Sequence, residues 1–426
     1  MTPQKGKTMD LDAARAILRQ NDLGGYTVPT RGLYPFQWNW DSAITALGWH
    51  CFDEARAWRE ARKMFSGQWD NGLLPHILFH DESDSYFPGS DIWGAESRIP
   101  SSTISQPPVW ALAVALMLER SGTGASARAE ARELLPKLVD HHRWWFRDRD
   151  LGNSGLVETY HPWESGMDNS PAWDGPLANV PRVEWEYQRR DLSHVDPAQR
   201  PSRREYDRYL YLIEFLKNNE FDPHRLSAAS PYRVVDIATV SILHRATREL
   251  VGLCRQFDFE SAIPELEAAL ARTQEAVGDC WSEEHRCFLN RDKLAGALLR
   301  ERTTATLLPL FGLLADERQA GQMAALVEEW LAASRFSLAS THPESPRYEP
   351  ERYWRGPVWL HINWMIAEGL RAYGYDGLAG QVQAETRECV EEAGGYFEYY
   401  CSKTGKGCGG GDFSWTAAVA LFWLAG

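Results

Sequence analysis

The chain has 426 residues, of which 44% are apolar, so it can bury a large core even as a single barrel-like unit. Its formal net charge of −14, without a run of lysine or arginine, argues against nucleic acid or an anionic membrane as a partner. The seven scattered cysteines form no CxxC pair, and no signal peptide or membrane-spanning apolar stretch is visible, so we expect a reduced, cytoplasmic protein.

Helical periodicity dominates the chain. After a short amphipathic helix at residues 10–20, the pattern predicts twelve helices in six consecutive pairs, and strand-like runs are few and brief. The predicted helices span about residues 41–52, 53–67, 106–120, 126–147, 205–218, 233–257, 261–279, 303–315, 316–334, 357–373, 376–393 and 412–425. Tight connections alternate with long ones rich in Trp, Tyr, Gly and Pro. This alternation predicts an all-α, (α/α)6 toroid whose long connections gather at one mouth.

No linker divides the sequence, so we expect residues 1–426 to form a single domain. The longest stretch without helical periodicity is an insertion at about residues 148–204. Loops longer than about 15 residues in a compact domain are usually functional. We therefore expect this insertion to carry part of a binding or catalytic site.

The insertion contains the segment HPWESGMDNSPAWD at residues 161–174, where glycine and proline exclude a helix. Four acids lie in or just before it, beside two tryptophans: Glu158, Glu164, Asp168 and Asp174. Apolar walls raise the pKa of a carboxyl group, so that it can hold and donate a proton at neutral pH. For any one of these acids, the alternative is an acidic turn packed by its own aromatic side chains.

A second stretch of acid and aromatic residues, GGYFEYY at residues 394–400, contains Glu398. Two carboxylates from distant segments are what the hydrolysis of a glycosidic bond requires. The chain also has 19 Trp, 16 Tyr and 16 Phe, more than a helical core of this size needs. Flat rings stack on sugar faces, although packing beneath long loops accounts for part of this aromatic content.

Candidate binding residues also lie at two loop-to-helix junctions. In GLYPFQWNWD, Tyr34, Trp38 and Trp40 precede Asp41, which we expect to cap the helix and to stay charged at its N-terminus. A simple N-cap with a hydrophobic staple is the alternative. In SQPPVWALAV, Gln106 precedes two prolines, where its amide could bind a sugar hydroxyl or only cap the helix.

Cationic and aromatic candidates follow later in the chain. Arg200 and Arg203 end the long loop and could offer a planar fork to a carboxylate, or could form a solvated helix start. In RYWRGPVWLHINW, Tyr353 and Trp354 precede a helix and are better binding candidates than Trp359, which we place on that helix.

Two further patterns carry no cofactor. GKGCGGGDFSW at residues 405–415 is not a phosphate-binding loop, because it lacks GK[ST] and no strand precedes it. Its glycines predict a mobile or closely approaching loop beside Glu398. His76 and His80 have helical spacing, but no carboxylate pattern accompanies them, so we expect no metal site.

The segments ESGMDNSPAWD, FQWNWD, SQPPVWA, RYWRGPVW and FEYY…GGGDFSWTAA together resemble glycoside hydrolase family sixty-three, in order, from about residue 25 to 426. More narrowly, they resemble its compact bacterial mannosylglycerate and glucosylglycerate hydrolases. The resemblance implies an (α/α)6 catalytic domain and an inverting mechanism, with Asp168 as general acid and Glu398 as general base. It also implies these sugar and glycerate contacts: Tyr34, Trp38, Trp40, Asp41, Tyr86, Gln106, Arg200, Tyr206, Tyr353, Trp354 and Trp359. The loop at 81–100, which contains Tyr86, departs from the family by being richer in serine and acid.

We therefore predict an inverting α-glycosidase that hydrolyses a small soluble glycoside, α-mannosylglycerate or α-glucosylglycerate, with no metal or organic cofactor. Asp41 would hold the attacking water or a sugar hydroxyl. The nearest alternative is a trehalase-like α-glucosidase for a neutral disaccharide, which would not need Arg200. A sugar epimerase with paired histidines and a non-catalytic sugar-binding module are further alternatives. The choice between mannose and glucose, and whether the chain forms a homo-oligomer, stay open.

Overall fold

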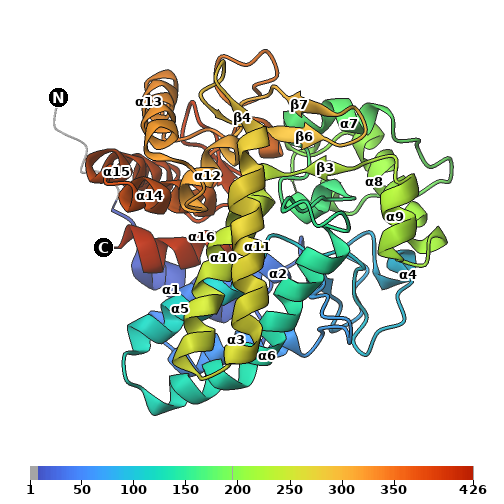
Figure 1. Cartoon of the computed structure of the whole chain (residues 1–426). Helices are drawn as coiled ribbons and strands as arrows, with labels where there is room; N and C mark the ends of the chain where they lie inside the picture. Colours follow the sequence, from blue (N-terminus) through green and yellow to red (C-terminus); the bar gives the residue numbers. More distant parts are fainter. Residues whose placement is uncertain (1–7, 194, 426) are drawn as a thin grey trace.

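The computed structural model describes residues 8–193 and 195–425. Helices dominate this part of the chain, and each of its strands has only two or three residues (Figure 1). Among the described residues, no helix combines the length and the apolar character needed to cross a membrane. The prediction of a mostly helical protein is confirmed.

An inner ring of helices closes on itself. Within residues 8–193 and 195–425 it has six members, each packed against the next, with the last packed against the first. In ring order they are α2 (Asn39–His50), α5 (Trp110–Ser121), α10 (Ile237–Gln256), α12 (Leu308–Phe311), α14 (Leu360–Ala372) and α16 (Ser414–Val419). Neighbouring helices cover most of this ring; in α2, for example, only His50 is not buried.

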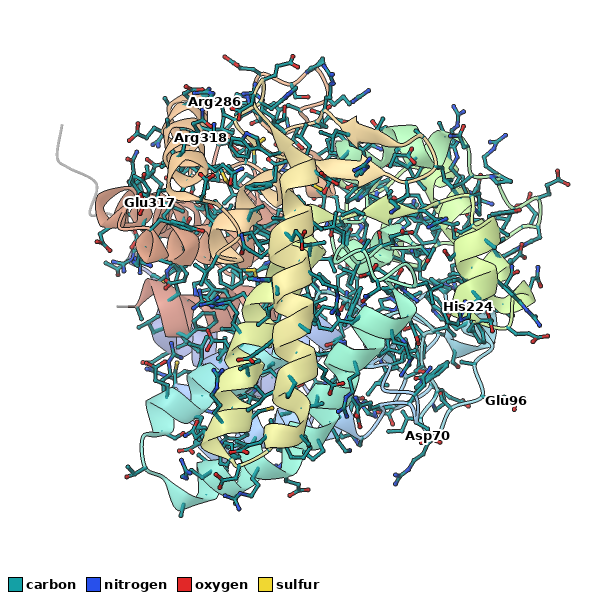
Figure 2. The ribbon with its side chains drawn as sticks, in the orientation of Figure 1. Asp70, Glu96, His224, Arg286, Glu317 and Arg318 are labelled. Carbon is teal, nitrogen blue, oxygen red and sulfur yellow. The ribbon has the colours of Figure 1, made fainter. Side chains whose placement is uncertain are left out.

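A second set of helices covers the ring from outside. They are α1 (Leu11–Gln20), α3 (Glu54–Phe65), α6 (Ala125–Asp148), α11 (Ile263–Ala276), α13 (Glu317–Ala333) and α15 (Asp376–Ala393). α13 packs on α15, and the others each pack on an inner helix. Charged side chains such as Glu317 and Arg318 of α13 lie at the periphery (Figure 2). The predicted (α/α)6 fold class is confirmed.

The pairing of helices differs from the prediction in one respect. The helix predicted at 205–218 exists as α8 (Arg203–Asn218), but it packs on the short α4 (Ser90–Trp93) rather than in the ring. Figure 1 shows α8 and α4 on the side of the molecule opposite α13 and α15. The sixth outer position belongs instead to α1, which packs on α16. Hydrophobic periodicity shows that a segment is helical but not which helix it packs against. Pairing the predicted helices in chain order therefore included the helix at 205–218 in the toroid and wrongly left out the first helix.

The segment between α6 and α10 is therefore longer than the predicted 148–204. Besides α8 it contains α7 (Asp174–Ala178) and α9 (Pro223–Ala229). Short antiparallel sheets connect the long loops to one another. Three of them have two strands: β1 (Gln37–Trp38) with β2 (Ile77–Leu78), β4 (Trp281–Ser282) with β5 (Cys287–Phe288), and β8 (Tyr399–Tyr400) with β9 (Gly407–Cys408). In another described sheet, β6 (Asn290–Asp292) lies between β3 (Val234–Val235) and β7 (Ala297–Leu299).

Glu60 on α3 fixes the loop that leads into α2. Its fully buried carboxylate accepts hydrogen bonds of 2.8–3.1 Å from the amide and hydroxyl of Thr27, from Gln37 Nε2 and from the Ser42 hydroxyl. Arg56 pairs with the same carboxylate at 2.8 Å. One buried acid thus holds the FQWNWD junction in place.

We expect Glu60→Ala to destabilise the fold by about 3 kcal/mol or more, because it leaves the buried Arg56 without its closest acid and four donors without an acceptor. Chemical denaturation followed by tryptophan fluorescence measures this loss. Glu328→Ala removes an exposed acid of α13 and serves as the control, with an expected change within about 0.5 kcal/mol. Equal losses in the two variants would contradict a special role for Glu60.

Candidate active site

A pocket lies where the long connections meet. It is lined by Pro29, Tyr34, Trp38, Trp40, Asp41, His76, Tyr86, Gln106, Trp163, Gly166, Asp168, Asp191, Arg200, Pro201, Tyr206, Tyr353, Glu398, Phe413 and Trp415. The structure thus brings together both predicted catalytic carboxyl groups and nine of the eleven predicted binding residues. These residues come from segments spread over almost the whole chain.

The loop that carries Asp168 is held rigid from inside. Glu164 pairs with Arg149 at 2.7 Å and accepts a hydrogen bond from the Tyr160 amide at 2.7 Å. The Tyr209 hydroxyl donates to the backbone carbonyl of Asp168 at 2.9 Å. Gly166 has a φ of +69°, and a Cβ there would lie 2.5 Å from the Trp40 ring, so this position requires glycine.

The electrostatic surroundings of Asp168 suit a proton donor. Burial raises the pKa of Asp168 to about 7. The negative charge of Glu398 adds to this shift, whereas the cation of Arg200 opposes it. A carboxyl group with this pKa is substantially protonated at neutral pH.

Glu398 directly precedes β8 and faces the pocket with 2% of its surface exposed. Its carboxylate accepts hydrogen bonds from the Tyr34 hydroxyl at 3.0 Å and from the Gly410 amide at 3.2 Å. Burial raises its pKa, and Arg200 and the Gly410 amide oppose that rise. The glycine-rich loop therefore approaches closely, as expected: a Cβ at Gly409 would lie 2.3 Å from Glu398 Oε2.

Arg200 connects the insertion to Glu398. It is buried and donates hydrogen bonds to the Tyr34 hydroxyl at 2.7 Å, to Asp191 Oδ2 at 3.3 Å and to Glu398 Oε2 at 3.5 Å. Its guanidinium lies 4.2 Å from the centre of the Tyr353 ring. The alternative of a solvated helix start is wrong for Arg200, whereas Arg203 is half exposed and pairs with Asp207 on its own helix.

Asp41 corrects two expectations. It does not cap α2, because the helix begins at Asn39 with Trp38 as its N-cap. The expectation that it stays charged is opposed as well: burial, with Glu398 and Asp168 nearby, raises its pKa well above the usual value. The helix N-terminus favours the anion, but burial beside two other acids opposes it more strongly.

Gln106 explains how α2 can begin without a side-chain cap of its own. Gln106 lies in an extended segment before α5, and its Oε1 accepts a hydrogen bond from the Trp40 amide at 3.3 Å. The predicted capping role is thus met on α2 rather than on the helix that follows Gln106. The same side chain lines the pocket.

Comparison with known proteins fits this geometry. The sequence profile of the mannosylglycerate hydrolase MGH1-like glycoside hydrolase domain matches residues 34–416. The chain belongs to this glycoside hydrolase family. Mannosylglycerate hydrolase MGH1 of Selaginella moellendorffii is 46% identical over 98% of this chain and 86% of its own length. The glucosylglycerate hydrolase of Mycolicibacterium hassiacum is 36% identical over 97% of each protein.

Solved structures agree with the sequence comparison. The crystal structure of a family sixty-three mannosylglycerate hydrolase from Thermus thermophilus, in complex with Tris and D-glycerate, superposes with a TM-score of 0.94. That protein is 44% identical, and the match covers 97% of this chain and 100% of the other. The resemblance to glycoside hydrolase family sixty-three is confirmed.

Two predicted contacts of this family member lie outside the pocket lining. Trp354 and Trp359 are buried and stack on each other with ring centres 3.8 Å apart and planes within 2°. Trp354 also lies 6.2 Å from the Trp40 ring, so the pair supports the pocket wall from behind. In front of them, Tyr353 has an unusual φ of +40°, which the backbone hydrogen bond from Trp354 to Asn169 Oδ1 helps to hold.

The remaining acids of the motif segment have structural partners. Glu158 pairs bidentately with Arg233 at 2.8 and 3.1 Å, and Asp174 pairs with Arg355 at 2.9 and 3.0 Å. Like Glu164, these two acids therefore fit the alternative in which an acid of this segment stabilises the loop. Asp168 is the member of this group that reaches the pocket.

The sequence reasoning missed several pocket residues. Trp163 and Trp415 lie inside motifs that were recognised, so aromatic enrichment next to an acid was a usable signal. His76 is a buried residue hydrogen-bonded to Ser102 at 2.5 Å, and burial keeps its pKa well below the usual value. Asp191 follows two arginines in a polar stretch and has no sequence signal.

In residues 8–193 and 195–425, no cluster of three His, Cys, Asp or Glu side chains is arranged to hold a metal ion.

Proposed function

We propose that this enzyme is an inverting α-glycosidase that hydrolyses α-mannosylglycerate or α-glucosylglycerate to hexose and glycerate. The observation that carries the proposal is a pocket in which Asp168 and Glu398, from distant segments, lie within each other's electrostatic field beside one buried arginine. Relatives named for each of the two substrates, similar over nearly the whole chain, support both candidates.

Asp168 protonates the glycosidic oxygen in this mechanism. Its pKa of about 7 leaves it partly protonated at neutral pH, and it can regain the proton after each turnover. Glu398 takes a proton from a water that attacks the opposite face of the anomeric carbon. The Tyr34 hydroxyl and the Gly410 amide orient its carboxylate. Inversion requires the two carboxyl groups to lie about 6.5–9.5 Å apart, which leaves room for the water.

The remaining pocket residues divide into two groups in this proposal. Trp38, Trp40 and Gln106, with Asp41, bind the hexose through stacking and hydroxyl contacts. Arg200 binds the carboxylate of the aglycone, with Tyr86, Tyr206 and Tyr353 around it. These latter residues all line the pocket. Among the described residues that line it, Arg200 is the one with a permanently cationic side chain, because the lining includes no other arginine and no lysine.

The neutral-disaccharide alternative would leave that buried arginine without a substrate partner.

We also propose that residues 1–426 act as one catalytic domain, supported by a single connected apolar core from Ala14 to Leu424. A cytoplasmic location is proposed as well, since all seven cysteines are free thiols. No cofactor and no partner beyond the glycoside is needed for this reaction, and a homo-oligomer is compatible with it.

A hydrolysis panel of mannosylglycerate, glucosylglycerate, trehalose and kojibiose tests the function. We expect hexose from one or both glycerate glycosides and little from the two disaccharides. Proton NMR in the first minutes should show the β-anomer of the hexose first, because a water rather than Glu398 attacks the carbon. Turnover of the disaccharides alone would contradict the substrate class. An α-anomer appearing first would contradict inversion.

Asp168→Asn and Glu398→Gln should each abolish turnover while folding and ligand binding survive. Both changes keep the shape of the side chain and remove its proton chemistry, which is worth about 10²–10⁴-fold per group. Initial rates measure the loss, and circular dichroism checks the fold. Asp174→Asn, which alters a paired acid of the same segment outside the pocket, is the control. A catalytic variant that keeps a third of the wild-type rate would remove that residue from the mechanism.

Arg200→Ala should lower kcat/KM for a glycerate glycoside by about one to two orders of magnitude. The reason is that a hydrogen bond to a charged partner contributes roughly 1.5–3 kcal/mol. The matching glycerol glycoside lacks the carboxylate and should lose less, so the ratio of the two losses isolates the contact. Because Arg200 also touches Glu398, some loss is expected on both substrates. Identical losses would show that Arg200 acts on the base alone.

A further inference from the structure

Asp191 lies between two buried arginines. Arg189 grips it bidentately, with Nε to Oδ1 at 3.0 Å and Nη2 to Oδ2 at 2.6 Å. From the other side, Arg200 Nε approaches Oδ2 at 3.3 Å. All three side chains are less than a tenth exposed. The two cations and one anion form a row that ends at Glu398, which Arg200 reaches at 3.5 Å.

This row is anchored at both ends. Arg189 lies 4.3 Å from the centre of the Tyr206 ring and also donates to the carbonyl of Pro201. Beside Arg200, the Gln199 carbonyl accepts a hydrogen bond from the Tyr399 hydroxyl at 3.0 Å. The Gln199 side chain accepts from the Gly409 amide, also at 3.0 Å. The position of Asp191 is therefore fixed relative to the hairpin that carries Glu398.

Arg200 has two carboxylates within reach. Asp191 Oδ2 and Glu398 Oε2 lie at nearly equal distances from it, 3.3 and 3.5 Å. A cation shared between two anions stabilises each of them less than a cation that serves one alone. A base paired fully with arginine would be a poor acceptor for the proton of water.

We propose that Asp191 is a positioning residue that holds Arg200 away from full pairing with Glu398, and that Arg189 sets how strongly it does so. The inference rests on the proposed roles of Glu398 and Asp168. Asp191 itself need not touch the reacting atoms. Its negative charge and its ion pair with Arg200 determine how readily the carboxyl groups of Asp168 and Glu398 ionise.

The tyrosines and the histidine that face these carboxyl groups keep their charge states through the working range. Tyr86 and Tyr206 face Asp191, and burial raises both pKa values. Tyr34, Tyr353 and Tyr399 face Glu398, and burial raises theirs as well. Burial also raises the pKa of Asp41 well above its usual value and keeps the pKa of His76 well below its usual value. The pH profile of kcat/KM therefore reports Glu398 on its acidic limb and Asp168 on its alkaline limb.

Asp191→Asn removes a negative charge and frees Arg200 to pair with Glu398. Both changes favour ionised carboxyl groups, so both limbs of the profile should move to lower pH, by about one unit. Arg189→Gln has the opposite sign. It removes a positive charge and leaves Asp191 free to hold Arg200, so both limbs should move to higher pH. Profiles are recorded with the substrate that the wild type hydrolyses best.

Glu158→Gln provides the matched control. It removes the charge of an acid that pairs with Arg233 and Lys293 in the same segment, outside the pocket, and both limbs should stay in place. Asp191→Glu keeps the charge and should keep the limbs near their wild-type positions even if the rate falls. A lower rate for Asp191→Asn with unmoved limbs would overturn the proposal and leave Asp191 as a support of the loop.

Infrared difference titration of the carboxyl groups in the resting enzyme measures the same shifts without a substrate. If the wild type hydrolysed nothing in the panel, the proposed function would fail, and this titration would still decide the role of Asp191. Should Asp191→Asn not fold, Arg189→Gln tests the same row with the opposite sign. Unmoved carboxyl bands in the folded variant would overturn the proposal.

Discussion

The pocket encloses several carboxyl groups around one arginine, and the rest of the site depends on this imbalance. Its lining includes four acids: Asp41, Asp168, Asp191 and Glu398. Among the described residues of the lining, Arg200 is the one arginine, and no lysine accompanies it. Burial and mutual repulsion both disfavour four ionised acids so close together. The structure resolves the conflict by different means for each acid. Burial raises the pKa of Asp41 well above its usual value and that of Asp168 to about 7, whereas Arg200 and Arg189 lower the pKa of Asp191 against the effect of burial.

The toroid makes such a pocket possible because it supplies rigid helix ends without filling the space between them. α2, α5, α14 and α16 begin without side-chain caps, and their first residues lie in or next to the site. Several outer helices, in contrast, carry Asp caps, as at Asp10, Asp53 and Asp316. An uncapped N-terminus leaves partial positive charge and free amides. On α2, Gln106 satisfies one of these amides from a neighbouring segment.

Much of this arrangement could be predicted from the sequence, for reasons that differ by residue. Helices longer than ten residues carry a clear period, and Asp168 and Glu398 lie in motifs dense with aromatic residues. What could not be predicted depends on which segments meet. α8 has a good helical pattern yet lies outside the ring, and Trp354 and Trp359 look like binding residues yet pack behind the wall. Asp191 shows no pattern, because its proposed role depends on contacts with Arg189 and Arg200 that only the folded chain makes.

One arginine serves both ends of the proposed reaction. Without substrate, Arg200 divides its charge between Asp191 and Glu398. In the proposed reaction, an anionic aglycone would add a third negative partner, and the share left for Glu398 would fall. Glu398, as the proposed base, would then bind a proton more readily when the correct substrate is present. A neutral disaccharide would not change that balance. The same buried cation can thus link recognition of the carboxylate to activation of the water, which simple complementarity of charge would not do.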